Sequence, residues 1–242
     1  RVLLVNKFYG LAGGVERAIR ESTLGLRGLV DFRILACREG IGPGRTAVLE
    51  GVPVVWAGSF GTVWSMPLSL SLPGHLRRLA RDVDLIHYHW PFPLAALAHL
   101  AVRPRTPALV TYHSDIVRQR RAAALLAPVT RAFLNSMRAV LVTSPPMAES
   151  PVLRSVRDRL EVVPLGVDPA EFAPTPGVLA QAGLLRRWAG GRPLVVFVGR
   201  FVPYKGLDVL LEAARGVNAV VLRVGSGPLE ARLRRRARTL GL

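Results

Sequence analysis

Two cations of different chemistry stand close together in the stretch GRFVPYKG, residues 199–206. Arg200 and Lys205 occupy it in a chain whose 33 Lys and Arg include lysine at positions 7 and 205 alone. Arginine offers a planar fork of donors, and lysine offers a point charge on a flexible stem. Together they can hold the two phosphates of a nucleotide diphosphate and stabilise the charge that a diphosphate gains as it leaves a sugar. The alternative is a solvated loop with two ordinary cations.

Three histidines lie near the ends of two neighbouring predicted strands. His87 and His89 lie in HYHWPFP, and His113 lies in TYHSD, where Ser114 and Asp115 follow it. No carboxylate or cysteine stands at the spacing of a zincin or a zinc finger, so we expect no metal site. His113 is placed to hydrogen-bond a substrate hydroxyl or to carry a proton, whereas His87 or His89 can simply be a buried, hydrogen-bonded side chain.

Two glycine pairs precede predicted helices. Gly13 and Gly14 come before a helix that starts near residue 15, and Gly225 and Gly227 open another in VGSGPLE. Glycines at such places let a phosphate or a sugar approach backbone N–H groups at the positive end of a helix. Neither pair has the G-x-G-x-x-G spacing of a dinucleotide site. A plain turn between strand and helix is the alternative for Gly13 and Gly14, and the Gly225–Gly227 pattern by itself has little specificity.

These residues need a scaffold that gathers the ends of several strands. Short apolar runs alternate with longer helical patterns, and most runs are apolar on consecutive positions, as in parallel strands buried on both faces. The alternation predicts an α/β fold with a doubly wound parallel sheet, whose ligands bind at the carboxyl ends of the strands. The predicted strands of the first part are Val2–Val5, Phe32–Ala36, Val52–Trp56, Asp84–Tyr88, Ala108–Tyr112, Ala139–Thr143 and Leu160–Val163. The predicted helices lie near residues 15–28, 70–82, 92–101, 121–137 and 145–157.

A proline-rich stretch, residues 164–177, interrupts this rhythm and is typical of a domain connector. We therefore expect one Rossmann-like domain over residues 1–165 and a second over residues 166–242. Two parallel strands with helices are too few for a stable sheet, so we also expect the chain to lack most of its second domain. The elements predicted there are a helix near 178–189, strands Leu194–Val198 and Ala219–Val224, and helices Leu207–Ala214 and Leu229–Leu240.

Composition narrows the class of protein further. The chain has 242 residues, is 50% apolar and carries a net charge of +17, which favours anionic partners. It has one cysteine, Cys37, which excludes an intrachain disulfide and fits a reducing, cytoplasmic compartment. The sequence contains no window of 18 apolar residues, so we expect no transmembrane helix. The first apolar run is too short for a signal peptide.

Seven segments, in order along the chain, resemble the retaining glycosyltransferases of family 4, which have the two-domain GT-B fold. The bacterial members that build exopolysaccharide or lipopolysaccharide are the most similar. The matching segments are GGVE (13–16), DLIHYHWPFPLA (84–95), VTYHSD (110–115), VTSP (142–145), VVPLGVDPAEF (162–172), VFVGRFVPYKGLDVLLEA (196–213) and LRVGSGPLEARL (222–233).

The resemblance implies transfer of a sugar from a nucleotide-diphosphate sugar to a glycan or lipid-linked acceptor, with retention of configuration and without a required metal or other cofactor. Arg200 and Lys205 match the pair that holds the donor diphosphate. Gly13 and Gly14 match the glycine loop that faces the donor phosphate or the acceptor, and His113 matches a histidine beside the donor sugar. The leaving phosphate of this family is usually described as helping to deprotonate the acceptor, so no protein nucleophile is assigned to Asp115.

Two departures from the family pattern matter. The Glu-x7-Glu segment that holds the sugar and the ribose is absent, so the 242-residue chain by itself is expected to be inactive. Tyr204 stands where the family more often has an acidic residue, which leaves the diphosphate pair intact and changes the finer contacts of the loop.

Other functions remain open at this point. A nucleotide-sugar epimerase can use the same fold, and a basic module that binds polyanions would need no catalytic residues at all. Nucleic acid is not the expected partner, because aromatic residues are only 7% of the chain and few lie among the basic ones. Residues 118–138, with five arginines and no acid, predict either a basic helix that contacts anionic lipid at the inner face of the plasma membrane or an ordinary helix packed on the sheet.

Overall fold

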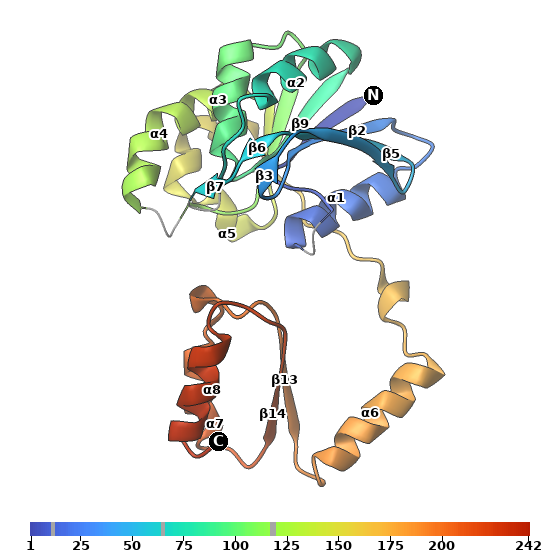
Figure 1. Ribbon diagram of the computed structural model, residues 1–242, viewed down its shortest axis with the longest axis vertical. Helices are drawn as coiled ribbons and strands as arrows, with labels where there is room; N and C mark the ends of the chain where they lie inside the picture. The colour runs from blue at the N-terminus through green and yellow to red at the C-terminus, as the bar shows by residue number, and fades with distance from the viewer. Residues whose placement is uncertain (11–12, 64–65, 117–119) are drawn as a thin grey trace. The chain divides into compact units, whose positions relative to one another are not determined.

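The computed structural model describes residues 1–10, 13–63, 66–116 and 120–242, without the side chains of residues 120–123. The chain divides into two compact units, Arg1–Val167 and Asp168–Leu242 (Figure 1). The sequence placed this boundary between residues 165 and 166. Each unit is an α/β structure, and each is described separately below.

Unit 1 is built on an eight-stranded sheet in the order β12-β11-β10-β9-β1-β2-β5-β4. Its strands are parallel except β4, which is antiparallel to β5. The chain winds from β1 towards one edge through β2 and β5, and then from β9 towards the other edge. The switch point of this doubly wound sheet therefore lies between β1 and β9, and ligands of such sheets bind at the carboxyl ends of the strands near this point. The strands are β1 (Val2–Val5), β2 (Phe32–Cys37), β4 (Arg45–Leu49), β5 (Val52–Ala57), β9 (Leu85–Trp90), β10 (Ala108–Tyr112), β11 (Ala139–Val142) and β12 (Leu160–Val162).

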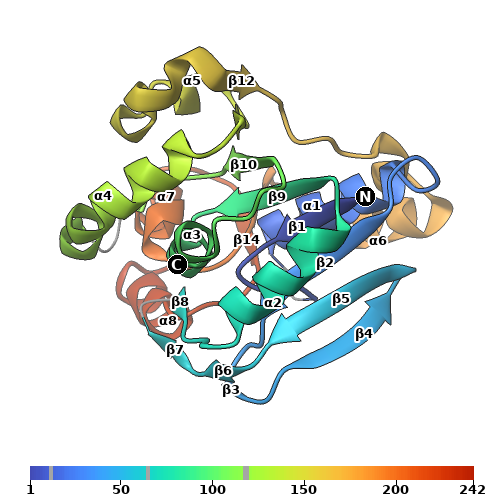
Figure 2. The same cartoon turned by 90° about the horizontal axis from the view of Figure 1, so that it is seen from above.

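Helices cover both faces of this sheet (Figures 1 and 2). On one face, α1 (Gly14–Gly25) packs through Ile19 on β1, β2 and β5. On the other face, α2 (Leu72–Leu79), α3 (Pro93–Val102), α4 (Arg120–Asn135) and the 3-10 segment η2 (Pro151–Arg159) form the larger core. Alternate residues of the central strands enter these two cores, which explains why the strands read as continuous apolar runs.

Several elements of unit 1 differ from the predicted ones. The strand β4 was missed because four of its five residues are exposed and give no burial pattern. It joins β5 through Glu50 and Gly51, whose φ angles of 50° and 83° suit a two-residue hairpin turn. The helix predicted near 145–157 is divided into α5 (Pro145–Ala148) and η2, because Pro151 cannot donate a helical hydrogen bond. The α2 helix ends in a 3-10 turn, η1 (Ala80–Asp82). Short two-stranded ladders also join β3 (Ile41–Gly42) with β6 (Ser59–Phe60), and β7 (Thr62–Val63) with β8 (Met66–Pro67).

Unit 2 contains one pair of parallel strands, β13 (Leu194–Val198) and β14 (Val220–Val224). Its core is small and lies under α7 (Leu207–Ala214) and α8 (Glu230–Thr239), which pack together through Leu207, Leu211 and Leu233. Ion pairs Asp208–Arg232 and Glu212–Arg236 link the two helices. The remaining elements are η3 (Pro169–Phe172), α6 (Pro176–Trp188) and η4 (Pro203–Lys205).

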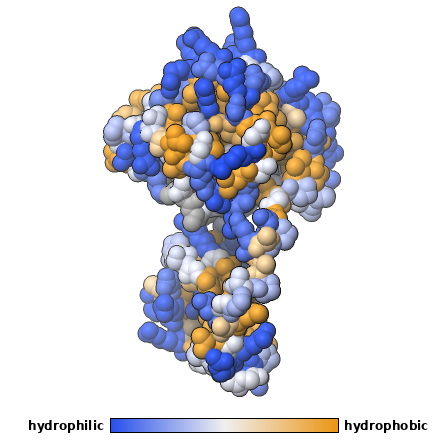
Figure 3. All heavy atoms as spheres, turned by 90° about the vertical axis from the view of Figure 1, so that its right-hand side faces the viewer, coloured by the Kyte–Doolittle hydropathy of each residue, from blue (hydrophilic) through white to orange (hydrophobic). Residues whose placement is uncertain are grey.

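Among the residues that the structure describes, no helix is both long enough and apolar enough to cross a membrane. Polar side chains cover much of the face drawn in Figure 3, with apolar patches between them on both units.

Candidate functional site

The predicted histidines of unit 1 come together at the carboxyl ends of β9 and β10. His87 and His89 are two residues apart on β9 and so lie on the same face of the sheet. The rings of His87 and His89 stack with their centroids 4.6 Å apart, and the rings of His89 and His113 stack with their centroids 5.2 Å apart. The three side chains thus form one contiguous cluster, which we call the histidine stack.

Hydrogen bonds hold the side chains of the histidine stack in place. The Nε2 of His87 lies 2.7 Å from the Oγ1 of Thr111, and the Nδ1 of His89 lies 2.9 Å from the Nε2 of His113. The backbone N–H of His113 donates to the carbonyl of Trp90. His89 is 7% exposed, whereas His87 and His113 are partly exposed. In the described part of the chain these rings belong to no cluster that could hold a metal ion.

Burial keeps the histidine stack neutral. Desolvation, with a smaller contribution from His113, lowers the pKa of His87 to about 4. Desolvation also lowers the pKa of His113 to about 4, and it lowers the pKa of the buried His89 well below its ordinary value. A neutral imidazole has one N–H donor and one acceptor nitrogen. At neutral pH an uncharged His113 can therefore offer a ligand one hydrogen bond.

A fourth histidine, His99 on α3, gives a test of this effect of burial on stability. It is 6% exposed, its Nδ1 lies 2.9 Å from the hydroxyl of Tyr88, and desolvation lowers its pKa from 6.5 to about 4. The unfolded chain binds this proton below about pH 6.5 and the folded chain only below about pH 4, so stability is lost as the pH falls through this window. Between pH 8 and pH 5 we expect wild type to lose about 2 kcal/mol more of its unfolding free energy than His99→Gln. Urea unfolding followed by tryptophan fluorescence at both pH values measures the difference, and equal losses would contradict it.

Asp115, which follows the histidine stack in sequence, has a structural role. Its Oδ1 accepts hydrogen bonds from the hydroxyl of Tyr112 at 2.7 Å and from the hydroxyl of Ser150 at 2.8 Å. These bonds connect the end of β10 to the start of η2. A carboxylate held by two donors in this way is a poor nucleophile, which agrees with assigning no such role to it.

The glycine loop after β1 is described from Gly13 onwards. Gly13 is the N-cap of α1 with an extended backbone, and Gly14 is the first residue of the helix. A Cβ on Gly14 would meet no atom within 4 Å, and a Cβ on Gly13 would meet the flexible side chain of Glu16. Packing against fixed atoms therefore gives no reason for either glycine, and their role in binding stays a prediction.

The second predicted site lies in unit 2, where two loops at the carboxyl ends of β13 and β14 are joined. The backbone N–H of Phe201 donates to the carbonyl of Ser226 at 2.8 Å, and the N–H of Leu229 donates to the carbonyl of Phe201 at 3.2 Å. Phe201 is 5% exposed and belongs to the core under α7 and α8. The two loops therefore form one connected surface, which we call the loop pair (residues 199–206 and 225–229).

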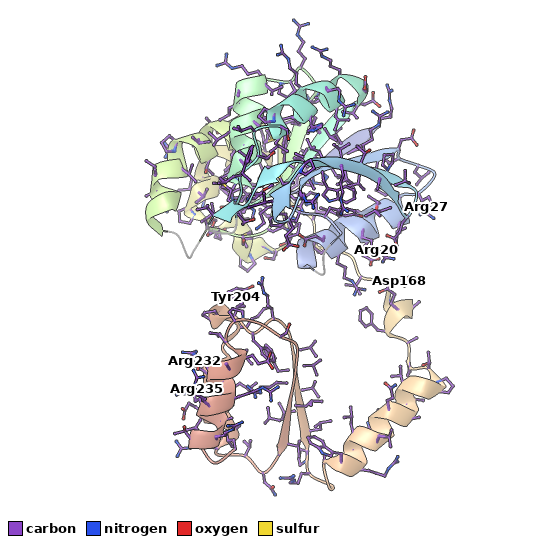
Figure 4. The ribbon with its side chains drawn as sticks, in the orientation of Figure 1. Arg20, Arg27, Asp168, Tyr204, Arg232 and Arg235 are labelled. Carbon is purple, nitrogen blue, oxygen red and sulfur yellow. The ribbon has the colours of Figure 1, made fainter. Side chains whose placement is uncertain are left out.

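Arg200 and Lys205 project from the loop pair. Both are exposed, and among the described residues neither forms an ion pair with a carboxylate. The Nζ of Lys205 lies 5.7 Å from the ring centroid of Tyr204, which is 75% exposed. Figure 4 shows Tyr204 at the strand-end side of unit 2, whereas Arg232 and Arg235 lie along α8. Gly206, with a φ of 70°, caps the start of α7 in a left-handed conformation that favours glycine.

Gly225 and Gly227 have a packing role that the sequence did not reveal. A Cβ on Gly225 would lie 2.1 Å from the carbonyl oxygen of Gly199, and a Cβ on Gly227 would lie 2.6 Å from that of Phe201. These glycines let the two halves of the loop pair touch. The close contact between the two loops by itself explains why these two positions are glycines. Their contact with a nucleotide stays a prediction.

The basic stretch 118–138 is described from Arg120, as α4, with side chains from residue 124. Phe133 and Met137 are each 1% exposed and belong to the large core, with Val129 packed against it. The apolar side of the stretch is therefore used inside unit 1, as expected for an ordinary helix on a sheet. Contact with anionic lipid stays a prediction, and Arg118 lies outside the described residues.

These features define a class of protein. A doubly wound parallel sheet followed by a second parallel α/β unit, each with polar side chains at its strand ends, is the pattern of the GT-B fold. HepE from Anabaena, solved in complex with UDP, superposes with a TM-score of 0.71 at 17% identity, over 100% of this chain and 66% of that one.

The chain belongs to glycosyltransferase family 4. Residues 12–171 match "Glycosyltransferase Family 4", and residues 186–242 match "Glycosyl transferases group 1". It is 34% identical to the O-antigen chain mannosyltransferase C of Escherichia coli over 100% of its length, and 38% identical to the D-rhamnosyltransferase WbpZ of Pseudomonas aeruginosa over 74%. The chain spans 65% and 46% of the lengths of these two proteins. The family and fold predicted from the sequence are confirmed.

Proposed function

We propose that the protein transfers a hexosyl residue from a nucleotide-diphosphate sugar to a glycan or lipid-linked acceptor in polysaccharide biosynthesis, with retention at the anomeric carbon. The observation that carries the proposal is the Arg200–Lys205 pair, exposed and without a carboxylate partner in the described residues, at the carboxyl end of β13. The likeness to the O-antigen mannosyltransferase over the full chain supports the same reaction class.

The unit 2 cations account for the chemistry of the leaving group. As the bond between the anomeric carbon and the phosphate oxygen breaks, the diphosphate gains negative charge, which Arg200 and Lys205 stabilise. The start of α7, capped by Gly206 next to this pair, adds the positive end of a helix. The departing phosphate then takes the proton of the acceptor hydroxyl on the same face of the sugar, so no protein nucleophile and no metal ion are required.

The unit 1 residues account for recognition. Neutral His113 offers one hydrogen bond to a sugar hydroxyl, and the start of α1 at Gly13 and Gly14 gives a ligand access to backbone N–H groups. The sugars in the names of the two relatives, mannose and D-rhamnose, share the same configuration at carbon 2. We therefore propose a donor with the manno configuration.

The test is an assay of the purified full-length protein with GDP-mannose, and with UDP-glucose as a second donor, in the presence of a glycan acceptor. The 242-residue chain alone is expected to give no transfer. We expect transfer from GDP-mannose that persists in excess EDTA, with an α-linked product by NMR of the anomeric proton. A β-linked product would contradict retention. Formation of the carbon-2 epimer without transfer would instead establish the nucleotide-sugar epimerase.

A further inference from the structure

The histidine stack contains a residue whose task is not explained by burial alone. His89 is enclosed between two other rings, and its Nδ1 faces the Nε2 of His113 at 2.9 Å. We propose that His89 is a positioning residue that holds His113 as the tautomer with its proton on Nδ1. His113 then presents an N–H donor, and not an acceptor, to a ligand at the carboxyl ends of β9 and β10. The ligand part of this inference rests on the proposed function, and the tautomer part does not.

The single proton between the two rings can be placed in two ways. Either His89 donates from Nδ1 and the Nε2 of His113 accepts, or the Nε2 of His113 donates and the Nδ1 of His89 accepts. Because both rings are neutral, each choice fixes the other nitrogen of each ring. In the first arrangement His89 has a bare Nε2 and His113 has an N–H at Nδ1. In the second, these two assignments are reversed.

The buried end of His89 decides between the two arrangements. Its Nε2 is buried and has no hydrogen-bond partner among the residues that the structure describes. The second arrangement would leave an N–H group there without an acceptor, whereas the first leaves only a lone pair. Buried unpaired N–H groups are rarer in native proteins than buried acceptors that lack a donor. The first arrangement is therefore the more stable one.

The far nitrogen of His113 is available for a ligand. The described part of the chain offers no hydrogen-bond partner to its Nδ1, and His113 as a whole is partly exposed. Its orientation is fixed by the backbone bond from His113 to the carbonyl of Trp90 and by the stacked ring of His89. An N–H held in this way suits a hydroxyl or phosphate oxygen of a sugar nucleotide.

Long-range 1H–15N correlation spectra of protein labelled with 15N-histidine, recorded without ligand, test the inference directly. In wild type we expect His113 to be protonated on Nδ1 and bare on Nε2. In His89→Leu, the ratio of the Nδ1–H to the Nε2–H tautomer is expected to fall by about two- to tenfold, the worth of one neutral hydrogen bond. In His89→Asn, whose side-chain amide can donate from a similar place, the ratio is expected to recover.

His99→Gln is the matched control. The side chain of His99 is hydrogen-bonded to Tyr88 in the core on the other face of the sheet, so this substitution should leave the His113 signals unchanged. Wild-type His113 protonated on Nε2, or an unchanged ratio in His89→Leu, would overturn the proposal. If His89→Leu does not fold, the wild-type spectrum and His89→Asn decide it. Because the spectra need no donor, a correct tautomer in a protein that fails to bind GDP-mannose would reject the proposed function alone.

Discussion

Replacing Arg200 by alanine is expected to lower kcat/KM for the nucleotide-diphosphate sugar by about 100- to 1000-fold, the usual cost of removing one donor that stabilises transition-state charge. The exposed guanidinium has no carboxylate partner among the described residues, so we expect its loss to leave the fold of unit 2 intact and to act on the proposed contact with the donor diphosphate. Steady-state kinetics with the donor varied measures the effect. Titration calorimetry with GDP shows how much of it arises in binding.

Two further variants sharpen this result. Arg200→Lys keeps the charge and loses the fork, so we expect it to recover only part of the lost activity. Lys205→Ala should act in the same direction as Arg200→Ala. Arg235→Ala is the control, because Arg235 is an exposed arginine on α8 rather than in the loop pair (Figure 4). Equal kinetics for Arg200→Ala and Arg235→Ala would contradict the diphosphate assignment.

Gly225→Ala is expected to lower the stability of unit 2 by about 2–6 kcal/mol, combining a strained backbone with overpacking. The φ of Gly225 is 138°, and the added Cβ would lie 2.1 Å from the carbonyl oxygen of Gly199. This neighbour is backbone at the end of β13, so it cannot turn aside as a flexible side chain would. Native-state hydrogen exchange of the α7 and β13 amides measures the loss within unit 2 by itself.

Gly190→Ala separates the two causes. Gly190 also has a positive φ, of 62°, but a Cβ there would meet no atom within 4 Å. Its replacement should cost only the backbone strain, about 1–2 kcal/mol. If Gly225→Ala destabilises unit 2 no more than Gly190→Ala does, the close contact within the loop pair is wrong.

The amino-acid sequence by itself determined the scaffold. Val2–Val5 and Ala108–Tyr112 were predicted with the bounds that the structure has, because strands buried on both faces need consecutive apolar residues. Leu194–Val198 was predicted with its observed bounds from the same kind of apolar run, although three of its five residues are exposed. The α/β winding places the residues after each strand at one edge of a sheet. His113, Arg200 and Lys205 could therefore be assigned to strand ends from local pattern alone.

The tertiary structure decided what these residues touch. The bond between His89 and His113 joins residues 24 apart, and Gly225 packs on Gly199 across two loops. The edge strand β4 forms because its backbone pairs with β5, although its side chains are mostly exposed. Such contacts depend on the distance between segments that are remote along the chain, and no local pattern of residue types encodes that distance. The sequence thus predicted which residue types stand at each strand end, and only the folded chain set their burial, their partners and their packing.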